Sequence, residues 1–199
     1  TNRDAKYEIT VKANSTNATY DGQSHIAKGV ETTTFEVDGN TYTVSGLKTE
    51  NPVKTDAGRY TNNITGTAVV KDAAGNDVTS QFTVKTENGN LVISKRNVTL
   101  TSASDEKVYN GKPLTNGKVT VSGDGFATGE GATYDVTGSQ TVAGSSENTF
   151  TYTLKQGTKA DNYTITTVKG TLTVTNRDAK YEITVKANST NATYDGQSH

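Results

Sequence analysis

The last 25 residues of the chain, 175–199, repeat the first 25, 1–25, without a single difference. A fold accepts many sequences at its surface, so identity through strands and loops alike indicates recent duplication rather than structural constraint. The two copies are offset by 174 positions. The sequence therefore predicts slightly more than one period of a tandem array, a design that usually supplies length or multivalency rather than chemistry.

A weaker repeat divides the long period into two related parts. Matching segments recur at offsets of 89, 86 and 81, and this drift is expected where loops of diverged copies differ in length. The matches are residues 20–22 with 109–111 (YDG and YNG), 57–58 with 143–144 (AG), and 89–96 with 170–177 (GNLVISKR and GTLTVTNR). We therefore predict a first module (1–95), a second module (96–175) and an N-terminal fragment of the next repeat (176–199).

The composition favours strands and small cores. Hydrophobic residues make up 31%, Trp, Met and Cys are absent, and 38 residues are Thr, which is β-branched and tolerates solvent on a strand. No stretch keeps a 3.6-residue apolar period, so helix should be minor. The expected fold is all-β: two tandem immunoglobulin-like antiparallel β-sandwiches, end to end, each with a small core, plus a partial third.

Alternation of apolar and polar residues locates the strands. Tyr7, Ile9 and Val11 alternate with polar residues, the pattern of a half-buried strand. Turn signals at 38–40 and 87–90 carry Asp-Gly and Asn-Gly pairs, which are typical of tight hairpins. Residues 72–77 are expected to form a loop with one helical turn. The remaining expected strands are 33–37, 41–46, 60–70, 81–86, 90–94, 97–102, 118–122, 132–137, 148–155, 162–167 and 170–175.

The connections between modules contain neither Gly nor Pro. This holds for residues 93–98 and again for residues 174–181. Flexible linkers are usually rich in Gly and Ser, so these segments predict near-continuous β connections and a semi-rigid rod. At about 3.3 Å per strand residue, the long axis of each module should measure roughly 35–45 Å.

Four elements occur in the same order in both modules: the YDG or YNG turn, an Ala-Gly pair before a strand, an aromatic strand, and a closing Leu-x-Val/Ile strand. This pattern resembles the YDG/MBG-type immunoglobulin-like repeats of large bacterial cell-surface proteins. The resemblance implies a β-sandwich stalk or adhesin repeat that is exported and anchored outside this segment. It implies no catalytic residues. Asn110 replaces the Asp of the motif in the second module and keeps a turn-competent residue.

Charge and composition exclude several classes. The net charge is −1, with acidic and basic residues interspersed, which argues against a nucleic-acid surface or a polybasic membrane patch. Nothing approaches 18 consecutive apolar residues, so no membrane insertion is expected in this segment. The absence of Cys excludes disulfides and thiolate metal sites, and it favours either the cytosol or a bacterial surface protein stabilised in other ways. The resemblance favours the extracellular location.

No catalytic, cofactor or metal site is predicted. Tyr20 and Tyr109 could stack on sugars, but their recurrence favours rings that close one end of each module. Hard oxygen ligands for Ca²⁺ could come from two clusters, although solvated turns explain them more simply. Those clusters are Asp72, Asn76 and Asp77, and Asp161 with Asn162.

Other chemical alternatives are weaker. His25 has no second histidine except its copy His199, so a His-based metal site or a catalytic triad lacks partners. Threonine-rich strands could bind ice, yet their spacing varies from strand to strand. A Lys–Asn isopeptide bond would need a buried lysine beside an asparagine and a carboxylate. The lysines on expected strands are Lys12, Lys85, Lys118 and Lys169.

Several Asn-x-Ser/Thr sequons, the acceptor pattern for N-glycosylation, also occur. In a chain rich in Asn and Thr they are explained by composition. They are at Asn14, Asn17, Asn63, Asn97, Asn162, Asn188 and Asn191.

The sequence thus favours a structural stalk or spacer repeat of a bacterial cell-surface adhesin-like protein, projecting a distal binding region. The alternative is a repeat module that itself binds host glycan, mucin or a host protein with avidity. In either case the chain is expected to contact adjacent repeats of the same array. No cofactor is expected. Residues 175–199 cannot build a module alone, so we expect them to extend a strand of the second module or to exchange with residues 1–25 of another copy.

Overall fold

The computed structural model describes residues 3–198 and confirms the all-β prediction, with about half of the residues in strands. No α-helix occurs in that range, and accordingly no helix there could cross a membrane. The first module contains β1 (Tyr7–Lys12), β2 (Thr16–Thr19), β3 (His25–Ile26), β4 (Thr34–Val37), β5 (Asn40–Thr49), β6 (Val53–Lys54), β7 (Gly58–Asn62), β8 (Ile64–Lys71), the 3₁₀ turn η1 (Thr79–Gln81), β9 (Phe82–Glu87) and β10 (Gly89–Ser94). The second contains β11 (Arg96–Ser102), β12 (Asp105–Val108), β13 (Val119–Gly123), β14 (Ala132–Val136), β15 (Gly144–Glu147), β16 (Phe150–Leu154), the 3₁₀ turn η2 (Ala160–Asn162), β17 (Tyr163–Val168) and β18 (Thr171–Thr175).

Each module brings its first strands back beside its last ones. In the first module β1 pairs with β9 in parallel, and β10 lies between β2, which is parallel to it, and β7, which is antiparallel. The second module repeats these pairings with β11 on β17 and with β18 between β12 and β15. Antiparallel pairs complete the sheets: β3–β6, β4–β5–β8, β14–β16 and β13 on β11.

The sheets are therefore small and either mixed or antiparallel, and the expectation of purely antiparallel sheets is wrong. The parallel pairs join strands that are far apart in the chain, such as Tyr7 opposite Phe82. Turn motifs report only on strands that follow each other directly, so the local patterns carried no sign of this pairing.

The strand registers show which positions of the two modules are equivalent. Tyr7 pairs with Phe82 in the first module, and Arg96 pairs with Tyr163 in the second. The first partners differ by 89 positions and the second partners by 81, which are the offsets of the sequence repeat. The internal repeat therefore corresponds to the same strand pairing made twice.

A buried asparagine interrupts the alternation at the same place in each module. Asn62 and Asn148 are fully buried, and their side-chain amides donate to the backbone oxygens of Asn14 at 3.1 Å and Ala103 at 2.9 Å. β7 ends at Asn62 and β8 begins at Ile64 in another sheet, so the single strand expected over 60–70 is two strands. In both modules the amide nitrogen of this buried asparagine ties down a neighbouring loop, whereas the side-chain oxygen of Asn148 is buried with no hydrogen-bond partner among the described residues.

The two Gly turns have different roles. Asp38 and Gly39 both have positive φ, as a type I′ turn requires, and they join β4 to β5 in the expected hairpin. The hairpin expected at 87–90 is wrong, because β9 and β10 belong to different sheets. Gly89 is needed there for space, since a Cβ would lie 2.1 Å from the backbone oxygen of Asn14. The one helical turn near residues 72–77 lies slightly later, in η1.

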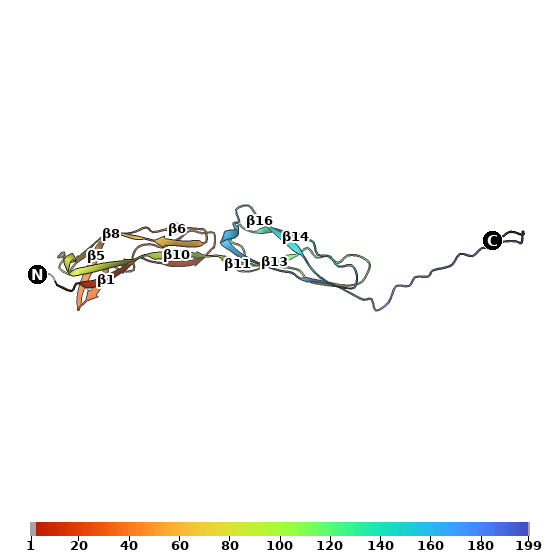
Figure 1. The fold of residues 1–199 in the computed structure, drawn as a ribbon, viewed down its shortest axis with the longest axis horizontal. Coiled ribbons are helices and arrows are strands. Elements are labelled where there is room, and N and C mark those ends of the chain that lie inside the picture. The colour runs from red at the N-terminus through yellow and green to blue at the C-terminus, as the bar shows by residue number, and fades with distance from the viewer. Residues whose placement is uncertain (1–2, 199) are drawn as a thin grey trace.

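The two modules lie end to end, and the C-terminal segment leaves the far end of the second one (Figure 1). Only Lys95 separates β10 from β11, which confirms the near-continuous connection predicted there. Residues 176–198 form no strand, so the predictions that 174–181 is continuous β and that this segment extends the second module are wrong. Its exchange with another copy stays a prediction.

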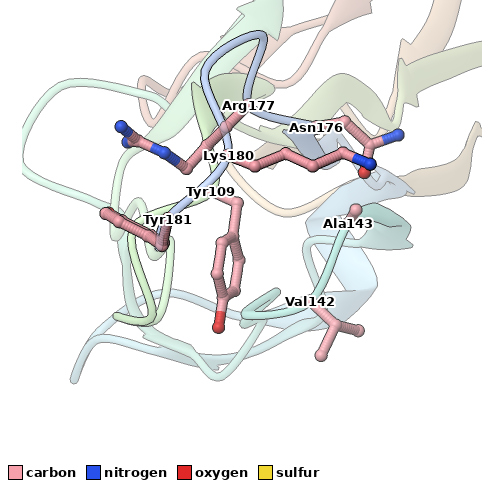
Figure 2. Close-up of a pocket in the computed structure, with 7 residues that line it drawn as sticks. All are labelled: Tyr109, Val142, Ala143, Asn176, Arg177, Lys180 and Tyr181. Carbon is pink, nitrogen blue, oxygen red and sulfur yellow. The ribbon is translucent and has the colours of Figure 1, made fainter. Parts of the chain in front are cut away.

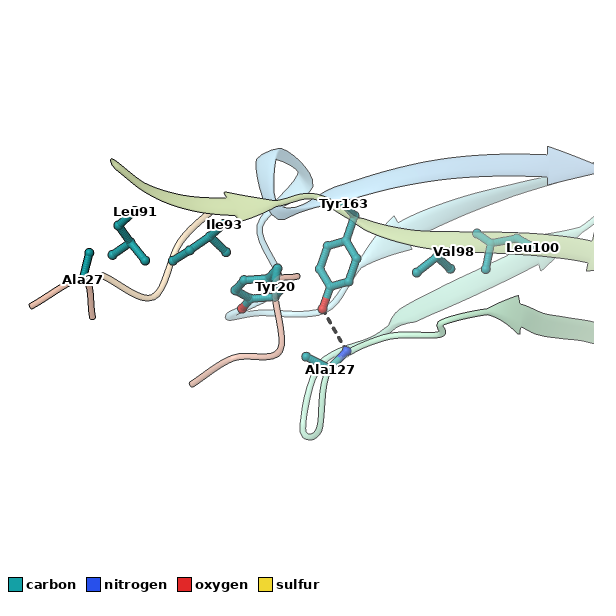
Figure 3. Packing of buried hydrophobic residues seen from close by; sticks show 8 residues of the cluster. All are labelled: Tyr20, Ala27, Leu91, Ile93, Val98, Leu100, Ala127 and Tyr163. Atoms are coloured by element: carbon teal, nitrogen blue, oxygen red, sulfur yellow. Dashed lines mark hydrogen bonds between the residues drawn. The ribbon is translucent and has the colours of Figure 1, made fainter. Parts of the chain in front are cut away.

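The largest buried cluster spans both modules instead of belonging to one. Figure 3 shows Leu91 and Ile93 at the end of the first module in line with Val98 and Leu100 of the second. All four side chains are at most 2% exposed. Burying side chains of this size contributes roughly 1.5–3 kcal/mol each, so the cluster stabilises the junction as well as the modules. Two smaller clusters lie around Phe82 and around Leu172.

Candidate functional site: the interface between the modules

At the interface one carboxylate accepts hydrogen bonds from two tyrosine hydroxyls, one from each module. Tyr20 follows β2 in the first module, and Tyr163 opens β17 in the second; their rings meet edge to face with centroids 5.5 Å apart. Glu130, in the loop before β14, accepts a hydrogen bond from the Tyr20 hydroxyl at 2.9 Å and one from the Tyr163 hydroxyl at 3.0 Å. Such edge-to-face rings and charge-assisted hydrogen bonds favour one relative placement of the modules.

The surroundings keep both phenols protonated. Burial, followed by the hydrogen bond to Glu130, raises the pKa of Tyr20 to about 12. Burial also raises the pKa of Tyr163, with a further contribution from Glu130, while the backbone N–H of Ala127 acts in the opposite direction. Both hydroxyls therefore remain hydrogen-bond donors at neutral pH.

The turn after Tyr20 holds this ring at the end of its module. Gly22 has φ +79°, a conformation that glycine adopts readily and that side-chain-bearing residues avoid. The Asp21 carboxylate accepts the backbone N–H of Gln23 at 2.9 Å and lies 2.9 Å from Nε2 of His25. The Gln23 N–H, then His25, lowers the pKa of Asp21, so the turn is held by an ionised side chain.

A second contact joins the modules beside the aromatic pair. Asn162, at the end of η2, is 2% exposed; its Oδ1 accepts the backbone N–H of Ala57 at 2.8 Å and its Nδ2 donates to Asp56 at 3.0 Å. Lys159 donates to the other oxygen of Asp56 at 2.9 Å. The bond from Lys159, then that from Asn162, lowers the pKa of Asp56. The ion pair is half-exposed and contributes little, so the buried amide carries most of this contact.

Arg96 ties the loop that carries Glu130 to the junction. Its Nε donates to the backbone oxygen of Gly125 and its Nη2 to that of Asp124, both at 2.7 Å. Its Nη1 reaches the backbone oxygen of Tyr20 at 3.4 Å. Because Arg96 is the first residue of β11, the guanidinium fixes this loop directly at the connection between the modules.

These side chains are suited to a permanent contact. They are engaged with one another and with the backbone. Across residues 3–198, no group of three or more His, Asp or Glu side chains is placed to hold a metal ion. What the arrangement does is fix the end of one module against the start of the next.

The structure places the candidate residues from the sequence in turns and at the interface. Tyr20 is 5% exposed, so its ring is not available to a sugar, and Tyr109 is half-buried at the far end of the second module. The Asp72 carboxylate closes its own turn by accepting from Ala74 and Asn76. His199 lies outside the described residues. The remaining candidates are also engaged in hydrogen bonds. Asp77 bonds to Thr79, and His25 bonds to Asp21. Asn162 bonds to Asp56 and Ala57 across the interface.

The lysines proposed for an isopeptide bond are on the surface. Lys12, Lys85 and Lys169 form ion pairs with glutamates, at 3.6, 3.1 and 3.0 Å, with side chains that are 46–60% exposed. Lys118 is also exposed. None of these four lysines is therefore buried beside an asparagine, as that chemistry would require.

Sequence reasoning missed Glu130, Asp56, Lys159 and Arg96 as interface residues. Their types are common on any surface, and their partners lie up to 110 positions away. The connection between β13 and β14, residues 124–131, carries Glu130 to the first module. Its length gave no signal in the sequence, because the stretch from Tyr109 to Ala143 is no longer than the equivalent stretch from Tyr20 to Ala57.

No family model matches this chain, and no curated protein or solved structure is significantly similar to it.

Proposed function

We propose that this chain is a segment of the stalk of a bacterial cell-surface, adhesin-like protein. In this proposal its modules are immunoglobulin-like β-sandwiches that act as spacers outside the cell. The array holds a distal binding region away from the surface. The exact duplication of 25 residues supports the array, and the resemblance of the YDG, Ala-Gly and Leu-x-Val/Ile elements to surface-protein repeats supports the location.

The observation that carries the proposal is the interface between the modules. A spacer must resist folding back, which requires neighbouring modules to be fixed rather than loosely tethered. Here one residue connects the modules, a common apolar cluster crosses the junction, and Glu130 binds a tyrosine from each side. The modules also lie end to end, so each adds its length to the next (Figure 1).

Small-angle X-ray scattering on proteins with one, two and three periods tests the spacer function. The maximum dimension should rise in proportion to the number of periods, by roughly 70–90 Å for each two-module period at about 3.3 Å per strand residue. A compact particle, or a dimension that grows much more slowly than the number of periods, would contradict a spacer. Reproducible binding of one period on a glycan array would favour the adhesive alternative instead.

A further inference from the structure

A hollow of about 590 Å³ lies at the far end of the second module. We call it the end hollow. Figure 2 shows Tyr109 in its middle, with Tyr181 and Arg177 on one side and Val142 and Ala143 on the other. It is lined by Tyr109, Val142 and Ala143 of the second module and by Asn176, Arg177, Lys180 and Tyr181 of the duplicated segment. The wall of the second module is incomplete, since Val142 is 67% exposed.

The residues of the second module in the end hollow are equivalent to residues that are already covered at the first interface. Tyr109 is equivalent to Tyr20 at an offset of 89, and Ala143 to Ala57 at 86. The second module covers Tyr20 with the ring of Tyr163, and a second-module amide accepts the N–H of Ala57. The end hollow is therefore the same end of a module, without a following module against it.

The duplicated segment supplies one ring with two different neighbours. Tyr181 is the copy of Tyr7, and each has an arginine stacked on its face, at 4.0 and 4.1 Å. Tyr7 also packs on Phe82, with centroids 5.5 Å apart, whereas Tyr181 packs on Tyr109 at 6.5 Å. Because the two tyrosines are identical copies, the same ring can contact Tyr109 behind it and Phe82 ahead of it.

We propose that the end hollow is the docking site for a second copy of the first module, the one that the duplicated segment begins. The ring of Tyr181 then lies between the two modules, against Tyr109 on one side and the copy of Phe82 on the other. This rests on the proposed array in one respect only, that another first module follows. In this arrangement the docked module covers Tyr181, which is 58% exposed here.

The chemistry of this second interface differs from that of the first. Val142 stands where the first interface has Asp56, and Val78 of the next first module stands where the first interface has Lys159. An ion pair is thus replaced by two apolar side chains that can cover each other. Val142 therefore matches Val78 of a following first module, whereas a following second module would place the charged Lys159 against it. This difference favours a first module as the partner at this end.

The connection is also longer. One residue separates β10 from β11, whereas residues 176–180 separate β18 from Tyr181. This connection has its own local structure, since Nε of Arg177 donates to the backbone oxygen of Ala179 at 3.0 Å, as Arg3 does to Ala5. Docking through Tyr109 is therefore what distinguishes a fixed joint from a short tether.

The test uses a protein in which residues 1–174 are followed by the whole chain. The absence of cysteine allows two spin labels to be placed on exposed positions, Thr153→Cys in the first copy and Thr67→Cys in the second. Their distance distribution, measured by pulsed electron spin resonance, should be as narrow as that of the same pair across the first interface of one chain. A five-residue tether without docking would spread it over about 12 Å.

Variants decide whether the docking residues act as proposed. Tyr109→Ala should broaden the distribution to the width of the tether, and Tyr109→Phe should leave it narrow. Tyr152→Ala, which removes a ring from the side of the same module, is the matched control and should change nothing. Far-UV circular dichroism establishes that each variant is folded.

A broad distribution for the unchanged protein would overturn the proposal, and so would a folded Tyr109→Ala variant with a narrow one. Either result can be separated from a failure of the spacer function. If the joint is fixed by other contacts, the maximum dimension still grows with each period while Tyr109→Ala has no effect. If the array is not a spacer, the maximum dimension fails to grow with the number of periods, even where the distance distribution across this joint is narrow.

Discussion

Replacing Tyr20 by phenylalanine removes one hydroxyl from the interface and leaves the ring in place. The edge-to-face contact with Tyr163 and the burial of the ring are retained in this variant. What is lost is the hydrogen bond from the Tyr20 hydroxyl to the carboxylate of Glu130, at 2.9 Å. Tyr20→Phe therefore isolates the polar part of the contact between the modules.

The expected loss follows from the charge of the acceptor. A hydrogen bond to an ionised group contributes about 1.5–3 kcal/mol to stability, and Glu130 keeps its second donor, Tyr163, so the carboxylate is not left unpaired. The free energy of unfolding should fall by about 2 kcal/mol. Urea unfolding followed by far-UV circular dichroism measures this, because all sheets of both modules contribute to the signal.

The equivalent tyrosine of the second module provides the control. Tyr109 has no hydrogen bond from its hydroxyl among the described residues, so Tyr109→Phe should change the free energy of unfolding by less than about 0.5 kcal/mol. Equal losses in the two variants would show that the carboxylate at the interface is not the cause.

The same contact should respond to alkali. The pKa of Tyr20 is raised from 10.0 to about 12, so the folded chain holds this proton more tightly than the unfolded chain. The resulting stability is fully present below pH 10 and is lost as the pH rises to 12. A shift of this size corresponds to about 3 kcal/mol. The difference in stability between the unchanged protein and Tyr20→Phe should narrow over this range; a constant difference would refute the reasoning.

Two further substitutions test other contacts. Lys159→Met removes the partner that contributes most to lowering the pKa of Asp56, so it should reduce stability slightly at neutral pH. This reduction should vanish as acid protonates Asp56 below its usual pKa of 3.8. Urea unfolding at several pH values measures both effects. Gly89→Ala places a Cβ 2.1 Å from the backbone oxygen of Asn14 and should cost about 1–3 kcal/mol or more, whereas Gly117→Ala, with nothing within 4 Å, should change the thermal midpoint little. Similar midpoints for the two alanine variants would contradict the close approach at Gly89.

The alternating strands were predictable because their apolar residues face one side. The pattern of Tyr7, Ile9 and Val11 predicts β1, and the Asp38-Gly39 turn predicts the hairpin between β4 and β5. The short strands β2 and β12 were missed because they contain almost no large apolar residue. They form through pairing with β10 and β18, which are distant in the chain.

The interface was only partly predictable. Tyr20 attracted attention because its motif recurs at Tyr109, and recurrence is visible in a single sequence. Glu130 and Arg96 belong to the interface through contacts across the chain, and no local pattern distinguishes them from other surface charges. The duplication pointed to an array, yet it could not show that the two connections differ in length and in structure.

The parallel pairing of β1 with β9 and of β2 with β10 has a mechanical consequence. When both ends of the first module are pulled, β1 and β2 are drawn toward the N-terminal end, and β9 and β10 are drawn toward the C-terminal end. The paired strands are therefore pulled in opposite directions along their common axis. The backbone hydrogen bonds between them run across that axis, so the traction loads them in shear and the rungs from Tyr7–Phe82 to Lys12–Glu87 resist together. The second module, with β11 beside β17, meets tension in the same geometry. Tension along the chain would thus strain a set of bonds that rupture collectively and do not unzip one at a time.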